Sequence, residues 1–362
     1  MSNPLRLTNL RFDLETSPLR IEHHLTDFLC KLRLKARGLG EADIEAAVSR
    51  ADWGGDLGAC RPSRRDCLRI RERAQALATC RESASGLAHL SQDARKQLQN
   101  LQHVRAVQLT STHRADEIAA TLHAEMPWMT QATTLAWNAM RENLRQGAPA
   151  MHLPPLLLDG PPGVGKSYWA RRLASLIGTP AELIDAAAEP AGFAVAGSQN
   201  GWSTARPGRP VEVILREQVG NPVIVIDEID KVGAVRSEKG LSFALTGALL
   251  PLLEPLTARA WSCPYFRVTF DMRWISWILT SNNRSLVPAP LQSRCRVVDI
   301  PPLSGTDLAQ FARREGVARG LTDDVAETLA GKIETCSPRL DLRAVITLID
   351  GPVARENSPL LH

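Results

Sequence analysis

Residues 160–167 read GPPGVGKS, which fits the pattern G-x-x-x-x-G-K-[ST]. In such a loop, glycines let successive backbone N–H groups turn toward phosphate oxygens, a conformation that residues with a Cβ resist. The lysine can reach the β- and γ-phosphates, and the hydroxyl after it can ligate Mg²⁺. We therefore predict a loop that binds a nucleoside triphosphate with Mg²⁺. Its residues are Gly160, Pro161, Pro162, Gly163, Val164, Gly165, Lys166 and Ser167.

The segments on either side of this loop have the patterns that such a loop requires. Residues 156–158 (LLL) form a short apolar run of the kind found in buried strands. Residues 168–177 have helical spacing, with Ala170 and Leu173 on one face. The loop would thus lie between a strand and a helix, and the N-terminus of that helix would add its dipole to the phosphate site.

A second nucleotide-binding element follows in residues 221–231, NPVIVIDEIDK. Its β-branched run, residues 223–226, predicts a central parallel strand that is buried on both faces. Asp227 and Glu228 come directly after that strand, and ligands of open α/β sheets bind at the carboxyl ends of the strands. We expect Asp227 to hold Mg²⁺ together with Ser167, and Glu228 to be the general base that polarises the attacking water.

A third strand is predicted over residues 274–279, and it leads into Thr-Ser-Asn. The amide of Asn282, at the tip of this strand, is suited to a position between the γ-phosphate and the attacking water. Arg294 and Arg296 follow. A positive group there could reach a nucleotide on a neighbouring subunit and stabilise charge in the transition state.

The last sixty residues predict a small helical module. Helices are expected over residues 306–315, 322–334 and 339–349, separated by glycines and by Pro338. Because proline is favoured in the first turn of a helix, Arg339 would lie at the start of the last helix. A lid built from this module could place Arg339 against the phosphates.

In this order of elements the chain resembles the AAA+ ATPases, and among them the ATPase module of the Lon proteases, over roughly residues 150–345. The resemblance is carried by GPPGVGKS (160–167), NPVIVIDEIDKVG (221–233), ALLPLLEP (248–255) and TSNNRSLVPAPLQSRC (280–295). It implies an α/β fold with a parallel sheet flanked by helices and a C-terminal helical lid. It also implies ATP as the nucleotide and a hexameric ring with ATP at the subunit interfaces. The catalytic roles implied are sensor-1 for Asn282, trans arginine finger for Arg294 and sensor-2 for Arg339.

The resemblance further implies a residue that contacts the substrate in a central pore. In that family an aromatic side chain a few residues before a Pro-Gly grips substrate polypeptide, and GWSTARPG (201–208) places Trp202 there. The sequence departs from the family in having Trp instead of the usual Tyr, and in Ser203 and Thr204. The alternative is that Trp202 packs inside the domain.

Residues 1–112 do not resemble the substrate domain of Lon proteases and read as a mostly helical domain. Helices are expected over residues 21–36, 41–51, 63–80 and 91–104. In and just before the third of these, four basic residues would fall roughly on one helical face: Arg61, Arg65, Arg69 and Arg73. This face is either a stripe that contacts the phosphate backbone of a nucleic acid or a face that is simply solvated.

Residues 113–150 predict a long or broken helix that leads into the nucleotide-binding domain. Trp128, Met129, Trp137 and Met140 are spaced for one side of that helix. Apolar stripes of this kind mostly belong to a core, and the alternative is that these side chains flank the adenine base.

The composition is that of an ordinary globular protein, with 362 residues, 44% hydrophobic residues and a net charge of +4. Seven cysteines without C-x-x-C pairs suggest neither a zinc site nor a disulfide framework. The N-terminus lacks the apolar run of a signal peptide, and no stretch approaches the roughly 18 apolar residues of a membrane span. We therefore expect a cytoplasmic protein without a membrane partner.

The combined patterns predict an ATP hydrolase with three domains: residues 1–112 for binding a partner or substrate, a nucleotide-binding domain over 113–302 and a lid over 303–362. We expect hydrolysis to drive remodelling or unfolding of a macromolecule, with a protein as substrate or effector. Two alternatives stay open, a nucleic-acid-associated ATPase that uses the 61–73 helix and an ATP-dependent switch with slow turnover. We expect no protease active site, because Ser and Cys lack a convincing His partner and the chain stops after the lid.

Overall fold

The structure is a computed structural model that describes residues 4–41, 44, 61–187, 191–199, 205–234, 245–336 and 340–356. The chain divides into two compact units, one formed by residues 1–8 with 100–362 and the other by residues 9–99. The three nucleotide-binding elements all lie in the larger unit. Residues 1–8 and 100–112 are also part of it, whereas the functional boundaries proposed at residues 112 and 302 stay predictions.

In the larger unit, the described residues form a five-stranded parallel sheet in the order β2-β3-β6-β1-β7. The strands are β1 (Leu156–Asp159), β2 (Ala181–Asp185), β3 (Val223–Asp227), β6 (Ser276–Ser281) and β7 (Arg296–Asp299). Leu157 in β1 lies opposite Leu279 of β6 on one side and Val297 of β7 on the other. The apolar runs of β1, β3 and β6 are buried, as expected for strands covered on both faces. The predicted α/β fold is confirmed.

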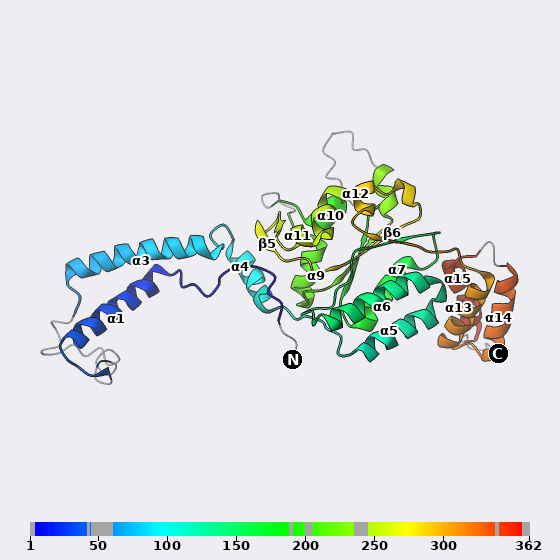
Figure 1. Cartoon of the computed structure of the whole chain (residues 1–362), viewed down its shortest axis with the longest axis horizontal. Coiled ribbons are helices and arrows are strands. Elements are labelled where there is room, and N and C mark those ends of the chain that lie inside the picture. Colours follow the sequence, from blue (N-terminus) through cyan, green and yellow to red (C-terminus); the bar gives the residue numbers. More distant parts are fainter. Residues whose placement is uncertain are drawn as a thin grey trace, which may run out of the picture. The chain divides into compact units, whose positions relative to one another are not determined.

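Helices cover both faces of this sheet. The connection from β1 to β2 contains α7 and crosses the sheet toward its β2 edge. The later connections, which contain α8–α10 and α12, cross the sheet in the opposite direction, toward its β7 edge. Because crossovers between parallel strands are right-handed, α7 covers one face and the later helices cover the other. Helices α5 and α6 pack together beside α7 (Figure 1). The bounds of the α-helices are α5 (Thr112–Glu125), α6 (Thr130–Arg145), α7 (Lys166–Ile177), α8 (Ala191–Ala196), α9 (Arg209–Glu217), α10 (Leu245–Leu253), α11 (Pro255–Ala258) and α12 (Ala289–Gln292). The 3-10 turns of this unit are η2 (Asn100–His103), η3 (Pro127–Met129), η4 (Ile229–Ala234) and η5 (Arg284–Leu286).

The two chain segments that flank residues 9–99 are both held in the larger unit. On the N-terminal side, the Leu7 carbonyl accepts a 2.7 Å hydrogen bond from the N–H of Asp271. Asp271 directly follows an antiparallel hairpin made of β4 (Trp261–Cys263) and β5 (Val268–Phe270). On the other side, Val107 donates to and accepts from the Asn221 side chain, each at 2.9 Å. These contacts lie just before β6 and β3, the strands that lead to the predicted catalytic residues.

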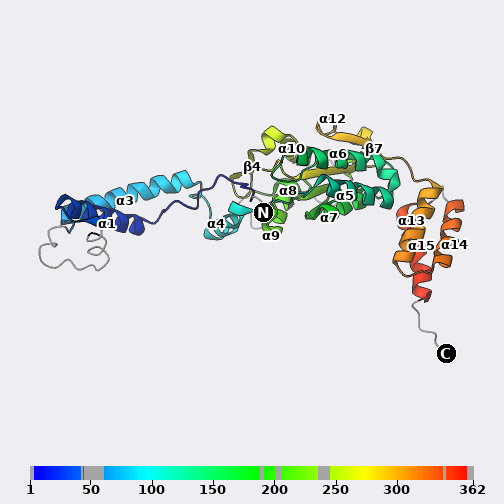
Figure 2. The ribbon, with the colours of Figure 1, turned by 60° about the horizontal axis from the view of Figure 1, so that its bottom comes forward.

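The C-terminal part of the larger unit, residues 303–356, is called the lid below. Its described helices are α13 (Gly305–Ala318), α14 (Asp323–Cys336) and α15 (Leu342–Glu356), and α13 packs against both of the others (Figure 2). Helix α13 begins with a capping box, in which Ser304 accepts from the Asp307 N–H at 3.1 Å and Asp307 accepts from the Ser304 N–H at 2.9 Å. The first two predicted lid helices are confirmed, and the third begins a few residues later than residue 339.

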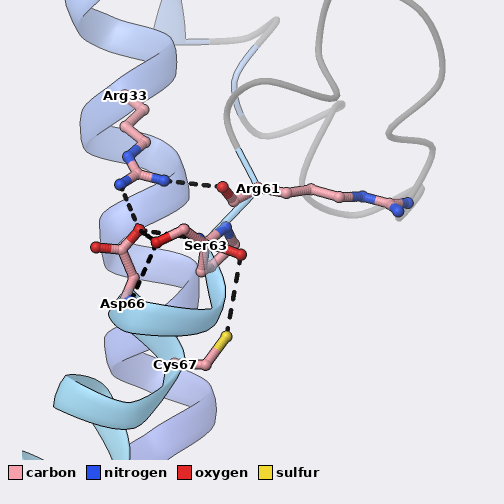
Figure 3. Close-up of polar contacts among 6 residues, drawn as sticks. Arg33, Arg61, Ser63, Asp66 and Cys67 are labelled. Carbon is pink, nitrogen blue, oxygen red and sulfur yellow. Dashed lines mark hydrogen bonds and ion pairs between the residues drawn. The ribbon is translucent and has the colours of Figure 1, made fainter.

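The smaller unit contains α1 (Pro18–Ala36), α3 (Arg64–Ser85) and α4 (Gln92–Gln99), and α1 packs against α3. The buried apolar residues of this contact are Ile21, Ala74 and Ala78. A capping box starts α3, because Ser63 Oγ accepts from the Asp66 N–H at 3.2 Å and the Asp66 carboxylate accepts from Ser63 in return. Arg33 of α1 donates to the same carboxylate at 2.8 Å (Figure 3). Hydrogen bonds from Ser63 and then Arg33 hold the pKa of Asp66 well below its usual range.

The predicted arginine face is only partly formed. Helix α3 begins three residues after Arg61, so Arg61 does not share the helical face of Arg65, Arg69 and Arg73. Figure 3 shows the Arg61 side chain extending away from Arg33, whose guanidinium donates to the Arg61 carbonyl at 2.8 Å. The helix predicted over residues 41–51 lies almost entirely outside the described residues.

The long or broken helix predicted over residues 113–150 is broken, and Trp128, Met129, Trp137 and Met140 do not all lie in one α-helix. Trp128 and Met129 are in the 3-10 turn η3, whereas Trp137 and Met140 are in α6. The break in the chain lies at Met126, between α5 and η3, and η3 runs directly into α6. Trp128, Met129 and Met140 are part of the core around the sheet and Trp137 packs against it, which confirms the core interpretation.

Candidate functional site

The loop of residues 160–165 connects β1 to α7 and depends on glycine. Gly163 and Gly165 have left-handed backbones, with φ of +76° and +89°. A Cβ at Gly163 would also collide with the side chain of Asp341, which lies at the start of α15. These constraints leave a turn of backbone amides at the N-terminus of α7, which begins at Lys166. Such a turn fits a phosphate group.

Lys166 is buried at the centre of the site, with 6% of its surface exposed. Its Nζ donates to the carbonyl oxygens of Gly160 and Pro161, at 2.8 and 2.9 Å, and to Asn282 Oδ1 at 3.0 Å. Burial lowers the pKa of Lys166, and the nearby carboxylates, Asp227 foremost, act in the opposite direction. The structure thus brings together Lys166 and Asn282, two predicted site residues that are far apart in the sequence.

A second group of predicted residues meets at the carboxyl ends of β3 and β6. Ser167 Oγ donates to Asp227 Oδ1 at 2.7 Å, and the Thr280 hydroxyl donates to the same oxygen. Parallel strands end at one edge of the sheet, which is why residues from α7, β3 and β6 converge here. Hydroxyl and carboxylate oxygens are the ligands that Mg²⁺ prefers, so Ser167 and Asp227 fit the ion that the sequence predicts.

Glu228 directly follows Asp227 and has an unusual backbone conformation, with φ of +57°. Its N–H donates to Thr280 Oγ1 at 3.2 Å, so the Thr280 hydroxyl contacts both acidic residues. The Glu228 carboxylate forms an ion pair with Lys231 of η4. A left-handed non-glycine residue is uncommon, and at a proposed catalytic position it indicates a backbone held by its surroundings.

These residues line a cleft of 430 Å³ between the sheet and the lid. From the loop and the strand ends it is lined by Pro162, Gly163, Gly165, Lys166, Ser167, Asp227, Glu228 and Asn282. A volume of this size is typical of a small-molecule site. The glycine loop, the buried amine and the oxygen donors in it fit a nucleoside triphosphate.

The sequence interpretation missed several other residues of this cleft. They are Tyr168, Arg171 and Leu183 from the sheet side, and Phe311, Glu315, Arg319, Leu342 and Ile346 from the lid. Helical periodicity identifies the apolar side of a lid helix but cannot show which of its residues will face the nucleotide. Arg343 of α15 also lines the cleft. Arg319, the residue that follows α13, is paired with Glu315 of α13 at 3.0 Å and with Asp350 of α15 at 2.7 Å.

Arg294 and Arg296 are exposed and do not line this cleft. Arg294 Nη1 donates to the Pro290 carbonyl at 3.2 Å, and its Nη2 lies 3.5 Å from Glu254 Oε2. Arg296 begins β7, at the opposite end of the strand from the cleft-facing carboxyl ends. A role for either arginine in hydrolysis would therefore require a second subunit.

Two predicted site residues, Trp202 and Arg339, lie outside the described residues. The roles proposed for them, as pore residue and as sensor-2, therefore stay predictions. In the described part of the chain, no helix is both long enough and apolar enough to cross a membrane.

The parallel sheet thus carries a glycine-rich loop and an acidic strand end at one edge. Residues 156–302 match the family "ATPase family associated with various cellular activities (AAA)". This part of the chain is thus a AAA module, and the expectation of a Lon-like AAA+ module is confirmed.

Lon proteases are among the relatives that the chain matches. It is 31% identical over 173 residues to a Lon protease of Desulfovibrio desulfuricans, which covers 48% of this chain and 19% of that protein. It is 31% identical over 187 residues to Lon protease 2 of Sorangium cellulosum, a match that covers 50% of this chain and 22% of that protein. It is 26% identical over 261 residues to the peroxisomal Lon protease homolog 2 of Spinacia oleracea, a match that covers 66% of this chain and 28% of that protein. The matched part thus spans between a fifth and three tenths of each relative.

Proposed function

We propose that this chain hydrolyses ATP and uses the energy to remodel or unfold a macromolecule. The observation that carries the first half of this proposal is the convergence of Lys166, Ser167, Asp227 and Asn282 on one cleft. They come from three separate motifs of the sequence, with Lys166 and Ser167 in the same loop, and each provides the charge or donor type that phosphoryl transfer requires.

In the proposed mechanism, the loop amides and Lys166 bind the phosphates of ATP. Ser167 and Asp227 would hold Mg²⁺, which supplies positive charge against the triphosphate. Glu228 accepts the proton of the attacking water, and Asn282 orients that water beside the γ-phosphate. Thr280 holds the Asp227 carboxylate relative to the Glu228 backbone, because its hydroxyl donates to the first and accepts from the N–H of the second.

We propose that catalysis is completed across a subunit interface of a ring, which the relation to AAA proteins supports and which we take to be hexameric. The exposed Arg294, held in place by Pro290 and Glu254, would then reach the nucleotide of the neighbouring subunit. Arg339 would approach the nucleotide from the lid of its own subunit. Trp202 would contact the substrate in the central pore.

A second candidate function, a nucleic-acid-associated ATPase, is favoured by one observation in the smaller unit. Arg65, Arg69 and Arg73 are exposed along α3, and none of them forms an ion pair with another described residue. Evenly spaced arginines without acidic partners are suited to phosphate contacts.

One experiment separates these two functions. The ATPase rate of the whole chain would be measured alone, with an unfolded protein, and with single- or double-stranded nucleic acid. Stimulation by the unfolded protein alone supports the remodelling function, and stimulation by nucleic acid alone supports the second candidate. A Glu228→Gln variant, used as an ATP-bound trap in a pull-down with mass spectrometry, would then identify what the chain holds. Absence of any ATP hydrolysis would contradict both.

A further inference from the structure

Trp128 packs in the core and also forms a hydrogen bond with the backbone of the phosphate-binding loop. It lies in η3, with 8% of its surface exposed. Its indole Nε1 donates a 2.9 Å hydrogen bond to the carbonyl oxygen of Val164, in the middle of the phosphate-binding loop. On the same ring, Phe311 of the lid packs edge to face, with ring centroids 6.5 Å apart.

The carbonyl of Gly163, the residue before Val164, also accepts a hydrogen bond, in this case from a residue of the lid. The N–H of Leu342, the first residue of α15, donates to the Gly163 carbonyl at 3.2 Å. Asp341 caps this helix by accepting from the Ala344 N–H at 2.8 Å, which fixes where the helix begins. Two successive carbonyls, those of Gly163 and Val164, are therefore bound by groups from outside the loop.

The orientation of these carbonyls determines that of two N–H groups. A trans peptide unit is planar, so its N–H points in the opposite direction to its C=O. Holding the Gly163 carbonyl fixes the N–H of Val164, and holding the Val164 carbonyl fixes the N–H of Gly165. The glycines at 163 and 165 are otherwise free to rotate, because their left-handed conformations carry no Cβ penalty.

We propose that Trp128 is a positioning residue for phosphate binding. With the Leu342 N–H, it holds two peptide units of the loop with their N–H groups turned toward the phosphates. The proposal rests on the proposed function, since it assumes that the loop binds a nucleotide. It also makes phosphate binding depend on the lid, because Leu342 belongs to the lid and the Trp128 ring packs against Phe311 of the lid.

Trp137 provides a matched control within the same region. It also donates one indole hydrogen bond, to Asp116 Oδ1 at 2.6 Å, but this bond joins α6 to α5 and does not involve the loop. Trp128→Phe and Trp137→Phe therefore each remove one indole N–H while keeping an aromatic ring. Only the first should change how the loop presents its amides.

The test is to measure dissociation constants for ADP and AMP by calorimetry, with a thermal melt of each variant. We expect Trp128→Phe to weaken ADP binding about tenfold, the effect of losing one hydrogen bond, and AMP binding much less, since AMP lacks the β-phosphate. Trp137→Phe should leave both affinities unchanged. An unchanged ratio of ADP to AMP affinity in Trp128→Phe overturns the proposal, whatever happens to the melting temperature.

A second pair of variants tests the other anchor. Leu342→Pro removes the N–H at the first position of α15, where proline is tolerated, and Leu342→Ala keeps that N–H while removing most of the side chain. We expect the proline variant to bind ADP more weakly than the alanine variant, and equal affinities would contradict the anchor. If the wild-type chain bound no ADP, the proposed function itself would fail, which is a different outcome from an unchanged ratio.

Discussion

The Ser167 hydroxyl donates to Asp227 Oδ1 across 2.7 Å and joins the start of α7 to the end of β3. Both residues were predicted as Mg²⁺ ligands from two separate motifs, and the parallel sheet brings them within hydrogen-bond distance. Thr280 of β6 donates to the same carboxylate oxygen and was not predicted to take part. The site is therefore organised by three neighbouring elements around one carboxylate.

Thr280 provides the first prediction. Thr280→Val keeps the shape of the buried side chain but removes the hydroxyl that contacts Asp227 and the Glu228 backbone. We expect kcat for ATP to fall about tenfold to a hundredfold, because hydrogen bonds to charged groups are the stronger class, with little change in ATP affinity. Thr280→Ser, which restores the hydroxyl, should recover most of the rate. An equal rate in both variants would exclude a role for the hydroxyl.

Arg294 provides a test of the ring. Arg294→Ala should bind ATP normally and lose about a thousandfold in rate, since an arginine finger contributes on that order. Mixed with Lys166→Ala subunits, it should regain some hydrolysis, because an intact Arg294 then faces an intact loop across one interface. If subunits exchange into common rings and no activity returns at any ratio, the trans role is wrong and Arg296 becomes the next candidate.

We expect Asn221 to stabilise the folded state and to take no part in ATP hydrolysis. Its buried side chain exchanges two hydrogen bonds with Val107 and donates to the Met151 carbonyl at 2.7 Å. Asn221→Ala removes the partner of the Val107 N–H and of the Met151 carbonyl, whereas the Val107 carbonyl still accepts from the Met151 N–H, so we expect a loss of about 1–3 kcal/mol in the free energy of unfolding. Urea denaturation measures this loss. Asn138→Ala, at an exposed position on α6, should stay near wild type.

Cys295 should be slow to react and should make stability sensitive to alkaline pH. Burial raises its pKa from 9.0 to about 12. A raised pKa means that the folded state holds the proton more tightly, so this contribution is complete below pH 9.0 and is lost as the pH rises toward about 12. At pH 8, iodoacetamide should modify the exposed Cys67 well before Cys295, as measured by mass spectrometry. Cys295→Ala should lose less stability between pH 8 and pH 10 than wild type.

The sequence predicted those parts of the site that depend on strand order and motif spacing. Lys166, Asp227 and Asn282 each follow an apolar strand of recognisable pattern, and parallel strands end at one edge of a sheet, so their convergence could be inferred. Trp128 could not be predicted in the same way. Its partner is a backbone carbonyl 36 residues later in the chain. Every residue has such a carbonyl, so no residue type in the sequence identifies the acceptor.

The helical regions show the same limit. The starts of the lid helices were predicted within a few residues from their periodicity and glycines, although the last helix continues to Glu356, beyond the predicted residue 349. The side chains that face the cleft, such as Phe311 and Ile346, depend on how the lid packs. Arg61 was placed on the face of Arg65, Arg69 and Arg73 although the helix predicted over residues 63–80 begins after it, and in the structure Ser63 caps α3.

The central claim, that the cleft hydrolyses ATP, is tested most directly by comparing wild type with Glu228→Gln and Lys166→Ala. ATP binding and phosphate release would be measured on the same preparations, with Lys332→Ala, an exposed lid substitution, as the control. We predict that Glu228→Gln binds ATP without turning it over, that Lys166→Ala does not bind it, and that the control matches wild type. Near-normal phosphate release by purified Glu228→Gln would contradict the account.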